Sequence, residues 1–166
     1  MRARRIGVTR RVDAPPEAVW ALLSDVGTWT RWGPWETAGL ERPGRDSAQG
    51  PGAVRRLCVG RWTLRELVEV AEAPRHLRYR LLSGMPVRDY VADVRLDPAP
   101  DGATQLSWSA HFVPRVPGSG RLLSRRLTAV LGEVSSRLTA FAEDPPRTRA
   151  DRPHPSSSEV TAARAA

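Results

Sequence analysis

The sequence is poor in the residues that build metal and nucleophilic centres. Its 166 residues include one cysteine, Cys58, and three histidines, His76, His111 and His154. None of these side chains stands at the spacing of metal ligands, and His111 falls on the solvent side of its predicted strand. A single cysteine excludes an internal disulfide framework and is typical of a reducing compartment. We therefore expect a cytoplasmic protein that uses no metal or other cofactor.

Long hydrophobic runs and nucleotide-binding motifs are also missing. No run approaches the roughly 18 apolar residues that a membrane span requires. No apolar segment follows the Arg-rich start at residues 1–5, so we expect neither a secretory signal nor stable membrane insertion. The glycines at 118–120 are typical of a loop and do not match a phosphate-binding motif.

Lysine is absent, so all 26 basic residues are arginine, and the net charge is +8 at pH 7. The charge is concentrated at the N-terminus, in Arg2, Arg4, Arg5, Arg10 and Arg11, whereas residues 12–143 are close to neutral. A nucleic-acid interface requires a basic cluster on the folded body. We expect no nucleic-acid binding and attribute the arginine excess to a coding bias.

The clearest pattern predicts a long helix over residues 120–142. Apolar side chains recur there at helical spacing and form one stripe. The stripe consists of Leu123, Leu127, Val130, Val134, Leu138 and Phe141. The opposite side, with Arg121, Arg125 and Ser135, is expected to be solvated. Pro145 and Pro146 end the helix because proline cannot continue the hydrogen-bond ladder. A helix this one-sided needs a broad apolar partner.

An antiparallel sheet is the predicted partner. A first strand is expected at 4–12 and a weak one at 36–41, followed by five strand-like runs with short breaks. Those runs cover 53–59, 62–71, 76–82, 88–97 and 103–113. All but the run 53–59 alternate apolar and polar residues, which indicates a sheet covered on one face. Arg10 breaks the alternation of the first strand, as either a bulge or a charge at the edge of a cavity.

Three of the six tryptophans lie close together, as Trp29, Trp32 and Trp35. They follow a predicted helix that begins near Pro15 and Pro16, where proline suits the first turn. The rings either close one end of the core or line a ligand pocket, because tryptophan buries a large surface and still offers an N–H.

The segment from Asp13 to Asp25, DAPPEAVWALLSD, followed by Trp29 and Trp32, resembles the opening of the START-like (SRPBCC) superfamily. Tyr90 with the later segment GATQLSW at 102–108 is similar to the last hairpin of its polyketide cyclase/dehydrase and lipid-transport group. The resemblance covers about residues 4–142. It implies an α+β helix-grip (START/Bet v 1-like) fold, in which a curved antiparallel sheet wraps around the long C-terminal helix.

The expected organisation is one START-like ligand-binding domain over residues 1–143. The remaining residues, 144–166, are rich in Pro, Arg, Ser and Ala and lack hydrophobic periodicity. Such a composition predicts a disordered tail.

The resemblance also implies a deep apolar cavity between the concave sheet face and the helix. Strand alternation puts four aromatic residues on that face, and Val130 and Val134 are expected on the helix wall. The predicted ligand-binding residues are Trp32, Trp62, Glu66, Tyr79, Tyr90, Trp108, Val130 and Val134. A filled core without a cavity is the alternative.

Glu66 is the polar candidate, because it shares the inward parity of Trp62, Leu64 and Val68. A buried carboxyl must be paired, or neutral with a raised pKa. It would then orient a ligand or move a proton. The alternatives are a structural pair with an arginine at the sheet rim and a register slip that turns it outward.

The predicted function is the binding of a small hydrophobic ligand, lipid-, polyketide- or isoprenoid-like, by a carrier or sequestering protein. The alternative is a polyketide cyclase/dehydratase-type enzyme in which Glu66 or a tyrosine moves a proton. A third possibility is a module whose Arg-rich N-terminus or tail binds an acidic partner. We assign no catalytic residue, and the sequence leaves enzyme activity, ligand identity, oligomeric state and protein partners open.

Overall fold

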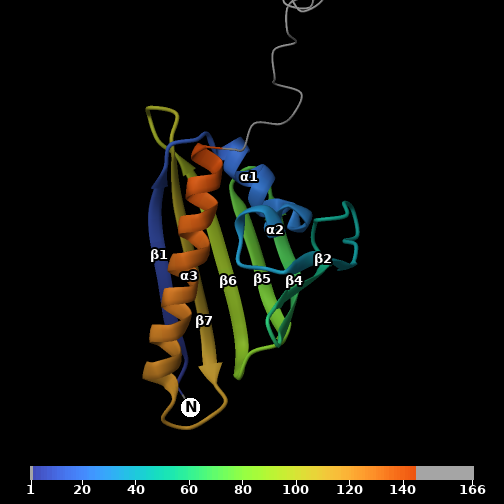
Figure 1. Cartoon of the computed structure of the whole chain (residues 1–166), viewed down its shortest axis with the longest axis vertical. Helices are drawn as coiled ribbons and strands as arrows, with labels where there is room; N and C mark the ends of the chain where they lie inside the picture. Colours follow the sequence, from blue (N-terminus) through green and yellow to red (C-terminus); the bar gives the residue numbers. More distant parts are fainter. Residues whose placement is uncertain (1, 145–166) are drawn as a thin grey trace, which may run out of the picture.

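A seven-stranded antiparallel sheet and one long helix form most of the computed structural model, which describes residues 2–144 (Figure 1). The strands are β1 Arg4–Val12, β2 Thr37–Arg42, β3 Val54–Val59, β4 Trp62–Glu72, β5 His76–Ser83, β6 Val87–Pro98 and β7 Thr104–Pro114. The helices are α1 Pro16–Ser24, the short 3-10 helix η1 Val26–Thr28, α2 Trp29–Trp32 and α3 Gly120–Glu143. The predicted tail lies outside the described residues, apart from Asp144.

The strands follow the order β1-β7-β6-β5-β4-β3-β2, so each pairs with its sequence neighbour except where β1 pairs with β7. Tight turns make this meander possible. Gly60 and Gly102 have φ of 53° and 84° in the β3–β4 and β6–β7 turns, a conformation that glycine adopts without strain. The predicted fold is confirmed, and each strand and α3 begins and ends within one residue of its predicted bounds.

The helix α3 crosses the concave face of the sheet and packs mainly on β1 and β7 (Figure 1). The segment α1–η1–α2 packs beside it and contacts α3 and β6. The core lies between these helices and the sheet, and it includes Val12, Trp29, Trp108, Phe112 and Leu138.

The buried side of α3 is rotated from the predicted stripe. Leu131, Val134, Ser135 and Leu138 are buried, whereas Val130 is 50% exposed. The prediction that Ser135 is solvated is therefore wrong, and Val130 lies at the edge of the buried side. Ser135 turns inward because it meets a polar group on β1.

That group is Arg10, whose Nε donates to Ser135 Oγ at 2.8 Å and whose Nη2 donates to the Gly132 carbonyl at 3.0 Å. β1 pairs with β7 without a register shift, which excludes a bulge at Arg10. Arg10 breaks the apolar alternation because it bonds α3 to the sheet.

We expect Arg10→Leu to lower the free energy of unfolding by about 1–2 kcal/mol, because it removes the donor to Ser135 Oγ and leaves the Gly132 carbonyl with the Ser135 hydroxyl as its remaining side-chain donor. Arg5→Leu on the solvent side of β1 is the matched control and should change stability by less than about 0.5 kcal/mol. Urea unfolding followed by circular dichroism measures both. Equal stability of the two variants would show that the Arg10 bonds contribute nothing.

Candidate functional site

A small cavity of about 50 Å³ lies between the middle of the sheet and α3. Its walls are largely apolar and aromatic. The lining residues are Trp29, Trp35, Leu64, Glu66, Tyr79, Met85, Tyr90, Trp108, Leu127, Val130, Leu131 and Val134. We call this space the inner cavity. Its volume suits water or the end of a ligand, because typical ligand pockets measure about 300–1,000 Å³.

Three polar side chains face the inner cavity. Glu66 on β4 is only 5% exposed, and its Oε2 has no hydrogen-bond partner among the described residues. Tyr79 on β5 accepts a hydrogen bond from Trp108 Nε1 at 3.2 Å, and its own hydroxyl donates to Tyr90. Tyr90 on β6 completes the group. Burial, together with the nearby Glu66, raises the pKa of both tyrosines, so the hydroxyls stay protonated.

Burial also controls the charge of Glu66. Removal from water raises its pKa from 4.5 to about 7, and the positive charge of Arg55 opposes part of this rise. At neutral pH the carboxyl is therefore divided between its protonated and ionised forms. It can donate a hydrogen bond, accept one, or exchange a proton.

Arg55 lies directly across the β3–β4 ladder from Glu66 and is fully buried. Its Nη2 donates to the Ser24 carbonyl at 2.7 Å, and its guanidinium lies 5.3 Å from the centre of the Trp29 ring. Nε and Nη1 have no partner among the described residues. Arg55 does not line the inner cavity, so it acts on Glu66 through its charge.

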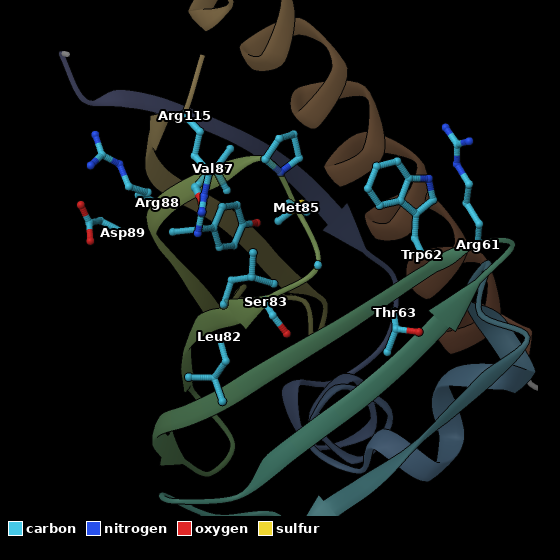
Figure 2. A pocket seen from close by; sticks show the side chains of 14 residues that line it. Arg61, Trp62, Thr63, Leu82, Ser83, Met85, Val87, Arg88, Asp89 and Arg115 are labelled. Atoms are coloured by element: carbon cyan, nitrogen blue, oxygen red, sulfur yellow. The ribbon is translucent and has the colours of Figure 1, made fainter. Parts of the chain in front are cut away.

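A larger surface hollow of about 680 Å³ adjoins the inner cavity (Figure 2). We call it the outer hollow. It is formed by the turn between β5 and β6, the start of β4 and Arg115 after β7, and its rim includes Arg61, Trp62 and Arg88. Met85 and Tyr90 line both spaces and separate them. A ligand that extends from the outer hollow to Glu66 would pass Met85 and Tyr90.

Most of the predicted site residues meet at the inner cavity. Glu66, Tyr79, Tyr90, Trp108, Val130 and Val134 all line it. Trp32 is buried in the core, where its Nε1 donates to Thr28 Oγ1. Trp62 is 47% exposed, so its predicted position on the covered face is wrong. It begins β4 and lies on the rim of the outer hollow (Figure 2).

Several site residues were not among those predicted. Trp29 and Trp35 belong to the tryptophan segment, whose spacing does not tell which rings face inward. Leu64 and Leu127 share the inward pattern of their elements, so alternation and helical spacing were sufficient to find them. Met85, in a turn, and Arg55, on a strand without alternation, gave no such signal.

No group of His, Cys, Asp and Glu within residues 2–144 is arranged to hold a metal ion. None of the helices in the same range combines the length and the hydropathy needed to span a bilayer.

Comparison with known proteins identifies the family of this chain and structures that share its fold. The family model "Polyketide cyclase / dehydrase and lipid transport" matches residues 3–143. A START superfamily protein from Mycobacterium smegmatis superposes with a TM-score of 0.75 at 16% identity, over 86% of this chain and 99% of that one. The Zhui aromatase/cyclase from Streptomyces sp. R1128 gives 0.66 at 24% identity, over 89% and 98%. XoxI from Bacillus cereus gives 0.72 at 20%, over 87% and 99%. No curated protein matches by sequence.

We expect Glu66→Gln to remove a pH dependence of stability. The folded-state pKa of Glu66 is raised, so folding binds a proton, and wild-type stability falls as pH rises from about 4.5 to 7. Relative to Glu66→Gln, the wild type should lose roughly 3 kcal/mol between about pH 4.5 and pH 8.

Urea unfolding at both pH values measures the loss. Glu17→Gln, the same change at an exposed position in α1, should show no such trend. A difference between wild type and Glu66→Gln that stays constant with pH would contradict the raised pKa.

Proposed function

The chain belongs to the polyketide cyclase/dehydrase and lipid transport family, and from this premise we propose that it binds a small hydrophobic ligand. The ligand has a lipid-, polyketide- or isoprenoid-like skeleton, and the protein acts as its carrier or sequestering protein. The observation that carries this proposal is the inner cavity, whose largely apolar wall surrounds one carboxyl group with an unbonded oxygen.

The two adjoining spaces suit different parts of such a ligand. The outer hollow, at about 680 Å³, falls in the size range of small-molecule pockets, whereas the inner cavity, at about 50 Å³, does not. We assign the bulk of the ligand to the outer hollow and one end of it to the inner cavity. Met85 lies between them, and methionine suits this position because its side chain is unbranched and flexible.

The inner end of the ligand should carry an oxygen. Protonated Glu66 and the Tyr90 hydroxyl are hydrogen-bond donors in a largely apolar space, and Trp35, which lines the same space, has a buried Nε1–H without a partner among the described residues. A ketone, ester or hydroxyl oxygen would satisfy them. A pure hydrocarbon would leave them unbonded, which costs free energy in a buried site.

A second candidate function is a cyclase/dehydratase-type enzyme, favoured by the pKa of Glu66 at about 7. A group that titrates near neutral pH is suited to general acid–base catalysis. Ionised Glu66 would remove a proton from a carbon next to a ketone, and the Tyr90 hydroxyl would stabilise the enolate oxygen that forms. The similarity to the Zhui aromatase/cyclase, at 24% identity, supports the fold of such an enzyme and leaves its chemistry to be tested.

Ligand binding is tested at the boundary between the two spaces. We expect Met85→Glu to weaken binding of an uncharged naphthyl ketone, measured by its fluorescence, at least tenfold, because the ligand would have to desolvate a charge. Val116→Glu places the same charge on an exposed loop residue that lines neither space. It should bind the probe like wild type. Equal affinities in all three proteins, or no binding by wild type, would contradict the proposal.

Glu66→Gln tests whether the protonated carboxyl binds the ligand oxygen. For a neutral ketone, wild-type affinity should fall by up to about tenfold between about pH 6 and pH 8 as Glu66 ionises and can no longer donate. Glu66→Gln should bind with little pH dependence, because its amide donates at both values.

If the protein is an enzyme, the same variant should also separate substrate binding from conversion. Wild type would convert a linear poly-β-ketone thioester to a cyclised product, and Glu66→Gln would bind this substrate without converting it. Product analysis by mass spectrometry decides this point. Absence of conversion by wild type would favour the carrier, whereas equal loss of binding and conversion would argue against a catalytic role of Glu66.

A further inference from the structure

One end of the sheet gathers segments that are distant in sequence. Antiparallel pairing brings together the start of β1, the β3–β4 turn, the β5–β6 turn and the connection from β7 to α3. We call this the open end, because the outer hollow lies there. It is the lower end in Figure 1, where the N-terminus and the beginning of α3 also lie.

The exposed hydrophobic residues gather at the open end. Five large hydrophobic side chains are exposed among residues 2–144, and Val130, on the side of α3, is the one that lies elsewhere. The others are Trp62, Leu82, Val116 and Leu122. They come from the start of β4, the end of β5, the loop after β7 and the first turn of α3. Single exposed hydrophobic residues are ordinary, but a group from separate segments at one end indicates a contact surface.

Arginines surround these hydrophobic side chains. Those at the open end are Arg2, Arg4, Arg61, Arg88, Arg115 and Arg121. Within the described residues none of them forms a salt bridge, and the acids nearby in these segments are Asp89 and Glu36. The Arg61 guanidinium lies 5.5 Å from the centre of the exposed Trp62 ring, so cation and aromatic ring are presented together.

Several arginines in other parts of the protein are paired with acids. Arg65 pairs with Glu41, Arg78 with Glu69 and Asp93, and Arg137 with Glu133. Their charge is largely neutralised within the protein. At the open end six arginines stand against two acids, so a net positive charge lies there, next to the exposed hydrophobic side chains.

We propose that the open end docks on the surface of a lipid bilayer that contains anionic phospholipids. Trp62, Leu82 and Leu122 enter the boundary between headgroups and acyl chains, where tryptophan is favoured by its apolar ring and its N–H. The arginines bind lipid phosphates. This docking is peripheral and depends on these residues alone, whether or not the inner cavity binds a ligand.

Charge complementarity and geometry together favour a bilayer over an acidic protein. The apolar side chains stand on four separate segments, two strand ends, a loop and the first turn of α3, and Trp62 and Leu82 line the outer hollow. A fluid lipid bilayer can accommodate each side chain separately, whereas a protein partner would need a surface of complementary shape. Docking in this orientation also makes the outer hollow face the bilayer surface.

The test is co-sedimentation of the full chain with sucrose-loaded vesicles. We expect binding to vesicles of phosphatidylcholine with about one third phosphatidylglycerol, and binding at least tenfold weaker to phosphatidylcholine alone. Trp62→Ser combined with Leu122→Ser should lower the partition coefficient roughly tenfold or more. Both residues are exposed, so circular dichroism should show unchanged folding.

A charge-matched pair of variants locates the surface. Arg61→Ala with Arg121→Ala should reduce vesicle binding about tenfold. Arg75→Ala with Arg95→Ala removes the same charge from exposed positions away from the open end, where neither arginine forms a salt bridge within the described residues, and should reduce it far less.

Three results would overturn the proposal. The first is equal binding to anionic and neutral vesicles, or none to either. The second is an equal loss in both arginine pairs, which would show a net-charge effect. The third is strong binding to soluble polyglutamate that Trp62→Ser with Leu122→Ser leaves unchanged, together with weak vesicle binding, which would assign the surface to an acidic protein.

Discussion

The long helix α3 packs mainly on β1 and β7, while the strands that follow curve away to β2 at the other edge of the sheet. A single helix cannot fill the concave face of seven strands, because packed helices lie only about 8–10 Å from their neighbours. The remaining space is filled by side chains of the tryptophan segment and by large residues of the sheet, such as Tyr79 on β5 and Trp108 on β7. The inner cavity is the part of this space that they leave empty, so it follows from the same packing that holds the fold together.

Glu66 and Arg55 lie opposite each other on adjacent strands, both buried, and they form no salt bridge or hydrogen bond with each other. Buried charges are costly unless they are closely paired, and an apolar pair of similar volume would stabilise such a core. Arg55 is partly stabilised by the Ser24 carbonyl and the Trp29 ring, whereas Glu66 faces the inner cavity with one oxygen unbonded. Departures from good core packing concentrate at functional sites, and for this reason we place ligand recognition at Glu66.

Strand alternation predicted the inward position of Glu66, Tyr79, Tyr90 and Trp108, because a strand has only two faces. It failed at Trp62, where the side chain lies at the start of the strand, on the rim of the outer hollow, beyond the covered part of the sheet. Helical spacing predicted the existence of α3 but not its rotation, which the Arg10–Ser135 hydrogen bond fixes across 125 residues of sequence. The pairing of Arg55 with Glu66 depends on strand register, and a run without alternation carries no signal of register.

The absence of lysine makes every basic residue an arginine, but it does not determine where net positive charge lies on the protein. Arginines occur on all sides of the protein, so the location of free charge depends on where the acids lie. Glu41, Glu69, Asp93 and Glu133 neutralise arginines of the sheet and of α3. At the open end the nearby acids are Glu36, which accepts a hydrogen bond from the Gly60 backbone, and Asp89, and within residues 2–144 neither forms a salt bridge with the arginines there. The distribution of acids, rather than the number of arginines, therefore makes the open end the basic end of the molecule.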